Sequence, residues 1–242
     1  MTLLISYLPL FLHSIGVTLW LSLCTLILST LLAIMLAAGI TSRIVTVRWF
    51  FIFIVEFIRS IPIFVLVLSV YFVVPMVAIS LDPFTSTVIS LSLWGGANGA
   101  EIIRGGLSSV DPGQKEAGNA LGFHPILFFT LVIVPQVVRT VLPPYCGLAT
   151  TLIQATTLGS VVGVVEFLRT GQIVIERSAL MVDGTPSLAI YGGMLVVYYL
   201  ICYTVSKAGI MLENRLSRHI RHNIDKGRAA PTSNVSSLDS QL

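Results

Sequence analysis

The stretch HSIGVTLWLSLCTLILSTLLAIMLAA, residues 13–38, decides the fold class. It contains no Lys, Arg, Asp or Glu, and neither does any residue before Arg43. About 20 residues of helix, rising 1.5 Å per residue, are enough to cross roughly 30 Å of bilayer hydrocarbon. The stretch is too long for a signal peptide and is not preceded by a basic residue, so we expect it to be retained as a membrane-spanning helix.

The composition of the whole chain agrees with a membrane protein. Of its 242 residues, 55% are hydrophobic and only 10% are charged, against roughly 25% charged in an ordinary soluble domain. The mean hydropathy is +0.92. So little charge cannot cover so much apolar surface in water, and the same numbers exclude intrinsic disorder. Three cysteines in 242 residues also exclude a disulfide-dense scaffold.

Gaps between charged residues predict four further spans. They cover residues 60–81, 84–100, 140–165 and 184–206, and the first of them begins at Trp49 if Glu56 and Arg59 lie within it. We therefore expect an all-α integral membrane protein, a bundle of about five transmembrane helices. The apolar run Ile126–Val134 is only nine residues long and ends at Pro135, which indicates a separate packed or interfacial helix.

The basic residues predict the orientation. Eleven Lys and Arg residues flank one set of loops and two flank the other, and such an excess marks the cytoplasmic side. The N-terminus is therefore expected outside and the C-terminus in the cytoplasm. Residues 211–242 are first basic and then polar, which predicts a disordered cytoplasmic tail whose basic part lies near anionic lipid.

Several kinds of chemistry are missing from the sequence. The three lysines follow Gln114, Ser206 and Asp225, so there is no Walker A motif with its Gly-Lys pair. The four histidines form no metal-binding pattern, and no nucleophile-base set is evident. We expect no enzyme activity and no metal site in this chain. The net charge of +3 is explained by topology, so nucleic acid is not an expected partner.

The loop RGGLSSVDPGQKEAGNALGFHP, residues 104–125, predicts a short helix on the cytoplasmic side. Asp111 can cap a helix that starts at Pro112, and Gly122 can end it. Glu116 would face outward beside small residues, which let another protein approach closely. The residues alone leave two interpretations open: a helix that docks on a partner, or a solvated connecting helix.

The sequence EAGNALG, residues 116–122, followed by VPQ, residues 134–136, resembles the EAA loop of ABC importer permeases. The surrounding blocks resemble the polar amino-acid uptake members of that group: EFIRSIP (56–62), RGGL (104–107), VRTVLPP (138–144) and TTLGSVVGV (156–164). The resemblance covers residues 13–210, which is nearly the whole chain outside the tail.

The resemblance implies a type I ABC importer permease fold in the bacterial inner membrane. It implies a permease domain over residues 13–210, with a coupling loop over residues 104–139. The partners would be ATPase subunits that bind ATP and Mg, a second permease subunit and an extracytoplasmic solute-binding protein, with no cofactor in this chain. The coupling residues implied are Glu116, Ala117, Gly118 and Gly122, and Gly118 stands where the family usually has Ala.

Polar residues in the second span are candidates for the substrate pathway. Glu56 and Arg59 are three residues apart, so they can pair on one helix face. If the helix starts near Trp49, Arg59 lies deep enough to suggest a pathway role, and if it starts later the pair is an ordinary interface feature. Pro62 should kink or end a helical segment.

The sequence departs from the family pattern at three polar positions in the fourth span. Gly147, Leu148 and Ala155 stand where the family often has Asn, Glu and Asp. Two interpretations follow: a different partner permease carries the substrate contacts, or the substrate lacks the usual amino and carboxylate groups. The remaining candidates for hydrogen bonding to substrate are Gln154, Thr156 and Thr157.

A second function class stays open at this stage. A stand-alone secondary transporter or channel would also be a helical membrane protein. Such proteins usually carry ionisable residues near the bilayer midplane or two repeated halves. The sequence offers one such pair, Glu56 and Arg59, and no convincing internal repeat.

Overall fold

A computed structural model describes residues 2–77, 79–178 and 187–228 of the chain, and within them all regular structure is helical. The helices are α1 (Thr2–Ile40), α2 (Val45–Ser60), α3 (Ile63–Phe72), α4 (Val74–Val77), α5 (Pro83–Ser108), α6 (Pro112–Ala120), α7 (Pro125–Phe128), η1 (Phe129–Ile133, a π-helix), α8 (Val134–Ala155), η2 (Thr156–Val162, a 3₁₀-helix), α9 (Phe167–Ser178) and α10 (Ser187–Arg228). The expected all-α membrane fold is confirmed.

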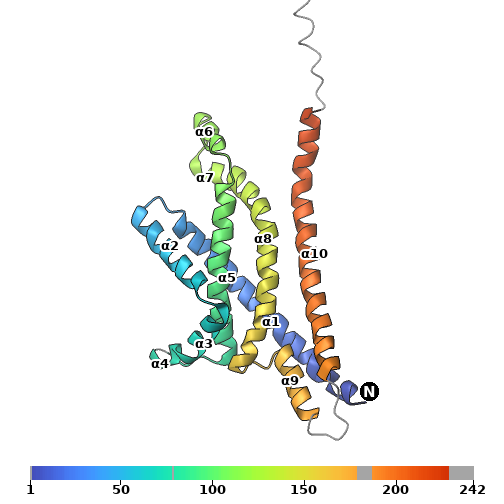
Figure 1. Cartoon of the computed structure of the whole chain (residues 1–242). Coiled ribbons are helices and arrows are strands. Elements are labelled where there is room, and N and C mark those ends of the chain that lie inside the picture. Colours follow the sequence, from blue (N-terminus) through green and yellow to red (C-terminus); the bar gives the residue numbers. More distant parts are fainter. Residues whose placement is uncertain (1, 78, 179–186, 229–242) are drawn as a thin grey trace, which may run out of the picture.

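The helices form an elongated bundle with two distinct ends (Figure 1). The helices α5 and α8 lie side by side, α1 crosses them obliquely, and α10 packs on α8 and α9. One end carries α6, α7 and the C-terminal end of α10. The other end carries α4, α9 and the N-terminus. The loop expected to be cytoplasmic and the N-terminus therefore lie at opposite ends.

Three helical stretches in the described residues are long and apolar enough to span a membrane: Tyr7–Ile40, Pro125–Val162 and Ser187–Arg215. The bent pair Val45–Ser60 and Ile63–Met76 passes the same test when the two helices are taken together, and counts as a fourth if they form one span. Helix α5 has 26 residues, which is also sufficient length, but it is rich in Gly and Ser and packs in the middle of the bundle. The five expected spans thus correspond to these four stretches and α5. Residues 184–186, at the start of the last expected span, lie outside the described residues.

The second span begins earlier than its charge gap and is broken. Helix α2 starts at Val45 and stops at Ser60, and the axes of α2 and the following helix differ by 99°. The break falls at Ile61, which is extended, with ψ at 127°. A residue before proline avoids the helical region because of the proline ring, so Pro62 causes the break as expected.

The expectation of a separate helix over Ile126–Val134 is wrong. Residues 125–162 are one continuous candidate span, which passes through η1 into α8. Pro135 does not end it, because it occupies the first turn of α8 after the π-helix, where its missing N–H is tolerated.

Residues 211–228, the first part of the expected tail, continue helix α10 in the structure. The physical reason is that this basic segment has no Gly or Pro before Gly227. Extending an existing helix is easier than starting one, so α10 continues through the segment. Residues 229–242 lie outside the described part of the chain.

Small residues allow α1 and α5 to pack closely. A Cβ atom on Gly96 would lie 2.7 Å from Cβ of Leu32, and one on Gly99 would lie 2.8 Å from Cβ of Ala33. Such distances are too short for real carbon atoms, so these positions require glycine. Close approach through small residues is a common way for helices to associate in membranes, where burial of apolar surface supplies little driving force.

This packing makes a matched pair of substitutions informative. We expect Gly96→Val to lower the stability of the detergent-purified protein by about 1–3 kcal/mol, the usual effect of overpacking. Gly105→Val makes the same change on the same helix, but nothing lies within 4 Å of that site. Thermal unfolding of both variants checks this, and equal melting temperatures would contradict the packing described for Gly96.

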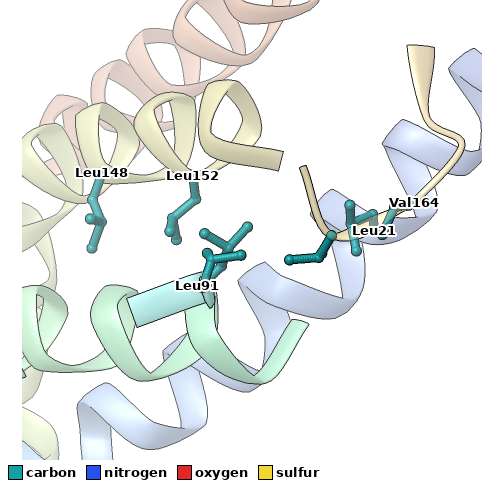
Figure 2. Close-up of a cluster of buried hydrophobic side chains, with 7 residues drawn as sticks. Leu21, Leu91, Leu148, Leu152 and Val164 are labelled. Atoms are coloured by element: carbon teal, nitrogen blue, oxygen red, sulfur yellow. The ribbon is translucent and has the colours of Figure 1, made fainter. Parts of the chain in front are cut away.

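The central apolar cluster holds four segments together. Leu21 of α1, Leu91 of α5, Leu148 and Leu152 of α8, and Val164 after η2 converge in it (Figure 2). Leu91 is fully buried and Leu148 is 8% exposed. The position at which the family often has a carboxylate is therefore part of an apolar core, and Leu148 points from α8 toward α5 (Figure 2).

Candidate coupling helix and substrate pathway

Helix α6 has the ends that its sequence predicts. The Asp111 carboxylate accepts a hydrogen bond from the Gly113 N–H at 2.8 Å, with Pro112 in the first turn. At the other end Gly122 has φ of +70°, and the Phe123 N–H donates to the Gly118 carbonyl at 3.1 Å. A left-handed glycine with this bond closes a helix. The result is a nine-residue helix between two spans, with Glu116 and Ala117 exposed.

A hydrogen bond fixes α6 to the start of α8. The Gln136 Nε2 atom donates to Gln114 Oε1 at 2.9 Å and also to the Val132 carbonyl at 3.0 Å. Gln114 lies two residues before the EAGNALG sequence and Gln136 ends the VPQ sequence, and the two glutamines are 22 residues apart. This one shared bond therefore sets the position of α6 relative to the start of α8.

A second contact fixes the other side of α6. Gly118 is buried, and a Cβ atom there would lie 2.6 Å from Phe128 Cε2. The rings of Phe128 and Phe123 are 6.3 Å apart. Gly118, which departs from the usual Ala of the family, thus matches a bulky neighbour in this chain, because the Phe128 ring occupies the space that a methyl group would need.

This contact predicts the effect of restoring the usual residue. We expect Gly118→Ala to displace α6 from the Phe128 ring and to lower transport several-fold. The double variant Gly118→Ala/Phe128→Leu should recover most of the lost activity, because the smaller side chain leaves room for the methyl group. Uptake by cells that carry each variant at equal membrane levels checks this. A double variant no better than Gly118→Ala would contradict the proposed fit.

Glu56 and Arg59 form the ion pair that their spacing predicts, with Nη1 and Oε1 3.2 Å apart. Both are partly exposed, at 60% and 35% of their side chains. Because α2 starts at Val45, Arg59 lies about 21 Å along the helix. Helix α2 therefore starts before Trp49, the earlier of the two starts considered, and it ends at Ser60, directly after Arg59.

The remaining candidates for the pathway lie on a different element. Gln154 is exposed near the end of α8, and its Nε2 lies 3.7 Å from Cys202 Sγ on α10. Thr156 is fully buried and donates to the Ile153 carbonyl, and Thr157 donates to the Gln154 carbonyl. Both hydroxyl protons are thus used within the helix, whereas the Gln154 amide stays accessible.

Sequence reasoning missed one buried carboxylate. Glu166 is fully buried and precedes α9, where it accepts hydrogen bonds from the N–H groups of Leu168 and Arg169 at 2.9 and 2.8 Å. The Tyr198 hydroxyl of α10 donates to it at 2.8 Å. The Phe167 N–H donates to Thr18 Oγ1 of α1 at 3.0 Å.

This cluster joins α1, α9 and α10. Glu166 follows the candidate span Pro125–Val162, and burial raises the pKa of its carboxyl while the surrounding N–H donors oppose that rise. The only signal in the sequence was its place as the first charge after the fourth span. A carboxylate just before an amphipathic helix is a good N-cap, and that reading would have found it.

These features define a class of protein: a helical membrane component with a short helix, held by contacts on both sides, at one end of the bundle. The family described as "Binding-protein-dependent transport system inner membrane component" matches residues 29–221. The chain belongs to this family. It is a permease component of the bacterial inner membrane, and it is not a member of a catalytic family.

Similar proteins agree with the family. The chain is 33% identical over 215 residues to the L-cystine transport system permease protein TcyB of Bacillus subtilis, covering 89% of this chain and 90% of that protein. It is 35% identical over 164 residues to the glutamine transport system permease protein GlnP of Escherichia coli, covering 67% and 72%.

Solved structures share the fold. The crystal structure of an amino acid ABC transporter with histidines matches with a TM-score of 0.79 at 26% identity, over 88% of this chain and 96% of that one. A permease chain of the MetNI methionine ABC transporter in an inward-facing form matches with a TM-score of 0.69 at 16% identity, over 88% and 98%. The type I ABC importer permease fold implied by the sequence is confirmed.

Proposed function

We propose that this chain is a permease subunit of an ATP-driven importer of amino acids or related small polar solutes, coupled to its ATPase through α6. The observation that carries this proposal is the fixing of α6 on both sides. Gln136 holds it through Gln114, and Phe128 packs on Gly118, while Glu116 and Ala117 remain exposed. A helix held this firmly can transmit a push from a docked partner to the spans, which a loose connecting helix cannot.

The amino-acid class rests on the relatives, whose names specify cystine and glutamine transport. ATP and Mg would be bound by separate ATPase subunits docked on α6, and a solute-binding protein would deliver substrate at the end that carries α4 and α9. This assignment places α6 in the cytoplasm and the N-terminus outside, as the excess of basic residues predicts.

We further propose that a different permease subunit contributes the main substrate contacts. In this chain Leu148 stands where the family often has a glutamate. Leu148 is 8% exposed and lies in the apolar cluster. A carboxylate there would lose its hydration without gaining a partner, at a large cost. Glu56, Arg59, Pro62 and Gln154 are the residues of this chain best placed for a secondary contribution. Thr156 and Thr157 remain candidates only as acceptors.

The test is to isolate the tagged full-length chain from its native membranes in mild detergent and to identify the proteins that accompany it by mass spectrometry. We expect an ATPase, together with a second and different permease. An ATPase without a second permease would indicate a homodimer and an unusual substrate. Absence of any ATPase, even after crosslinking, would overturn the coupling role of α6 and favour a stand-alone transporter.

A further inference from the structure

A cavity of about 400 Å³ lies between the α1–α2 connection and the segment from α6 to η1. Such a volume is within the range of small-molecule sites, roughly 300–1,000 Å³. Its walls are mostly apolar and include Phe123, Ile126, Phe128 and Phe129. Arg43 lines the same cavity and is its one charged lining residue among those described.

Arg43 is free to bind an anion. In the described part of the chain, no carboxylate lies within 4.0 Å of its guanidinium, whereas Arg59, Arg104 and Arg169 each pair with a glutamate. Its side chain is exposed. A guanidinium presents several N–H donors in a planar arrangement that suits phosphate oxygens.

The cavity also lies at one end of two candidate membrane spans. Arg43 follows the end of the α1 span, Ile40, by three residues. Ile126 and Phe129, on its opposite wall, belong to the span Pro125–Val162 and are 68% and 48% exposed. Apolar side chains at this depth face lipid chains, and a basic residue beside them faces headgroups.

We propose that this cavity binds one anionic phospholipid, with the phosphate at Arg43 and the first part of an acyl chain against Ile126 and Phe129. Charge complementarity selects an anionic over a zwitterionic lipid. The mixed character of the walls selects a lipid over a free phosphate, which would leave the aromatic side chains in water. The proposal does not depend on the coupling role of α6.

The test is native mass spectrometry of the detergent-purified full-length complex with added phosphatidylglycerol or phosphatidylcholine. The unmodified protein should retain phosphatidylglycerol preferentially. Arg43→Gln should weaken that retention about fivefold, the factor that corresponds to about 1 kcal/mol for one basic residue near a lipid surface. Arg43→Lys should retain a part of the preference.

Arg48→Gln is the matched control, because Arg48 is exposed on the same segment and does not line the cavity. It should bind phosphatidylglycerol as the unmodified protein does. Ile126→Trp, which fills the cavity without changing charge, should also weaken retention. Equal loss of phosphatidylglycerol retention in Arg43→Gln and Arg48→Gln would overturn the proposal. A crosslink from Asn119 to a partner protein, showing that a segment of that protein fills the cavity, would also overturn it.

Discussion

Uptake by cells that carry Glu116→Lys is expected to fall to background, and the purified variant is expected to lose its ATPase. The exposed carboxylate of α6 lies beside small residues, so a partner can approach it closely. Replacing a central interface carboxylate by a cation adds repulsion to the loss of the contact. Hot-spot residues of this kind contribute about 2 kcal/mol or more, which is roughly 30-fold in affinity.

Two variants separate this effect from misfolding. Glu116→Gln keeps the shape and should retain a part of the binding. Glu176→Lys changes an exposed carboxylate on α9, at the other end of the bundle, and should leave ATPase retention unchanged. Retention is measured as the ratio of ATPase to tagged permease after purification, with expression checked in the membrane fraction. Normal uptake in Glu116→Lys would remove Glu116 from the coupling role.

The second large effect is expected at Glu166. In Glu166→Ala the N–H groups of Leu168 and Arg169 and the Tyr198 hydroxyl lose their acceptor. These three bonds are partly buried, and each donor left unpaired costs about 1 kcal/mol, so the total loss is roughly 3 kcal/mol. We expect an apparent melting temperature several degrees lower in detergent, with increased proteolysis around α9.

The matched control is Glu176→Ala, since Glu176 is an exposed carboxylate on the same helix segment and pairs with Arg169 at 3.3 Å. An exposed pair contributes about 1 kcal/mol at most, so little change is expected. Tyr198→Phe removes one donor and should cost less than Glu166→Ala. The double variant should cost less than the sum of the two, because Tyr198 needs no acceptor once its hydroxyl is gone. Strict additivity would contradict the bond.

The parts of the fold that could be predicted are those that depend on neighbouring residues in the sequence, such as helix caps, prolines and uncharged runs. Asp111, Pro112 and Gly122 mark the two ends of α6, and the structure places them there. Pro62 marks the break between α2 and α3 in the same way. Long uncharged runs predicted α1 and the second half of the span Pro125–Val162, because insertion into a membrane depends mainly on the length and hydrophobicity of the local stretch.

The rest depends on contacts between distant residues. Nothing near Glu166 in the sequence reveals that α10 supplies a hydroxyl to it from 32 residues away. The pairing of Gln114 with Gln136 and the fit of Gly118 to Phe128 also depend on how the chain folds back on itself, which no local pattern records. Pro135 misled the sequence interpretation, because a proline often ends a helix, whereas this one lies in the first turn of α8, directly after the π-helix.

That π-helical turn, Phe129–Ile133, has a geometric consequence for everything before it. A π-turn holds one residue more than an α-turn, and each residue of an α-helix rotates the chain by about 100°. Shortening this segment by one residue would therefore swing α7 and α6 by about 100° around the axis of α8. Gln114 would no longer reach Gln136, and Glu116 would face another direction. The direction in which α6 faces is thus set by one extra residue in the π-helical turn.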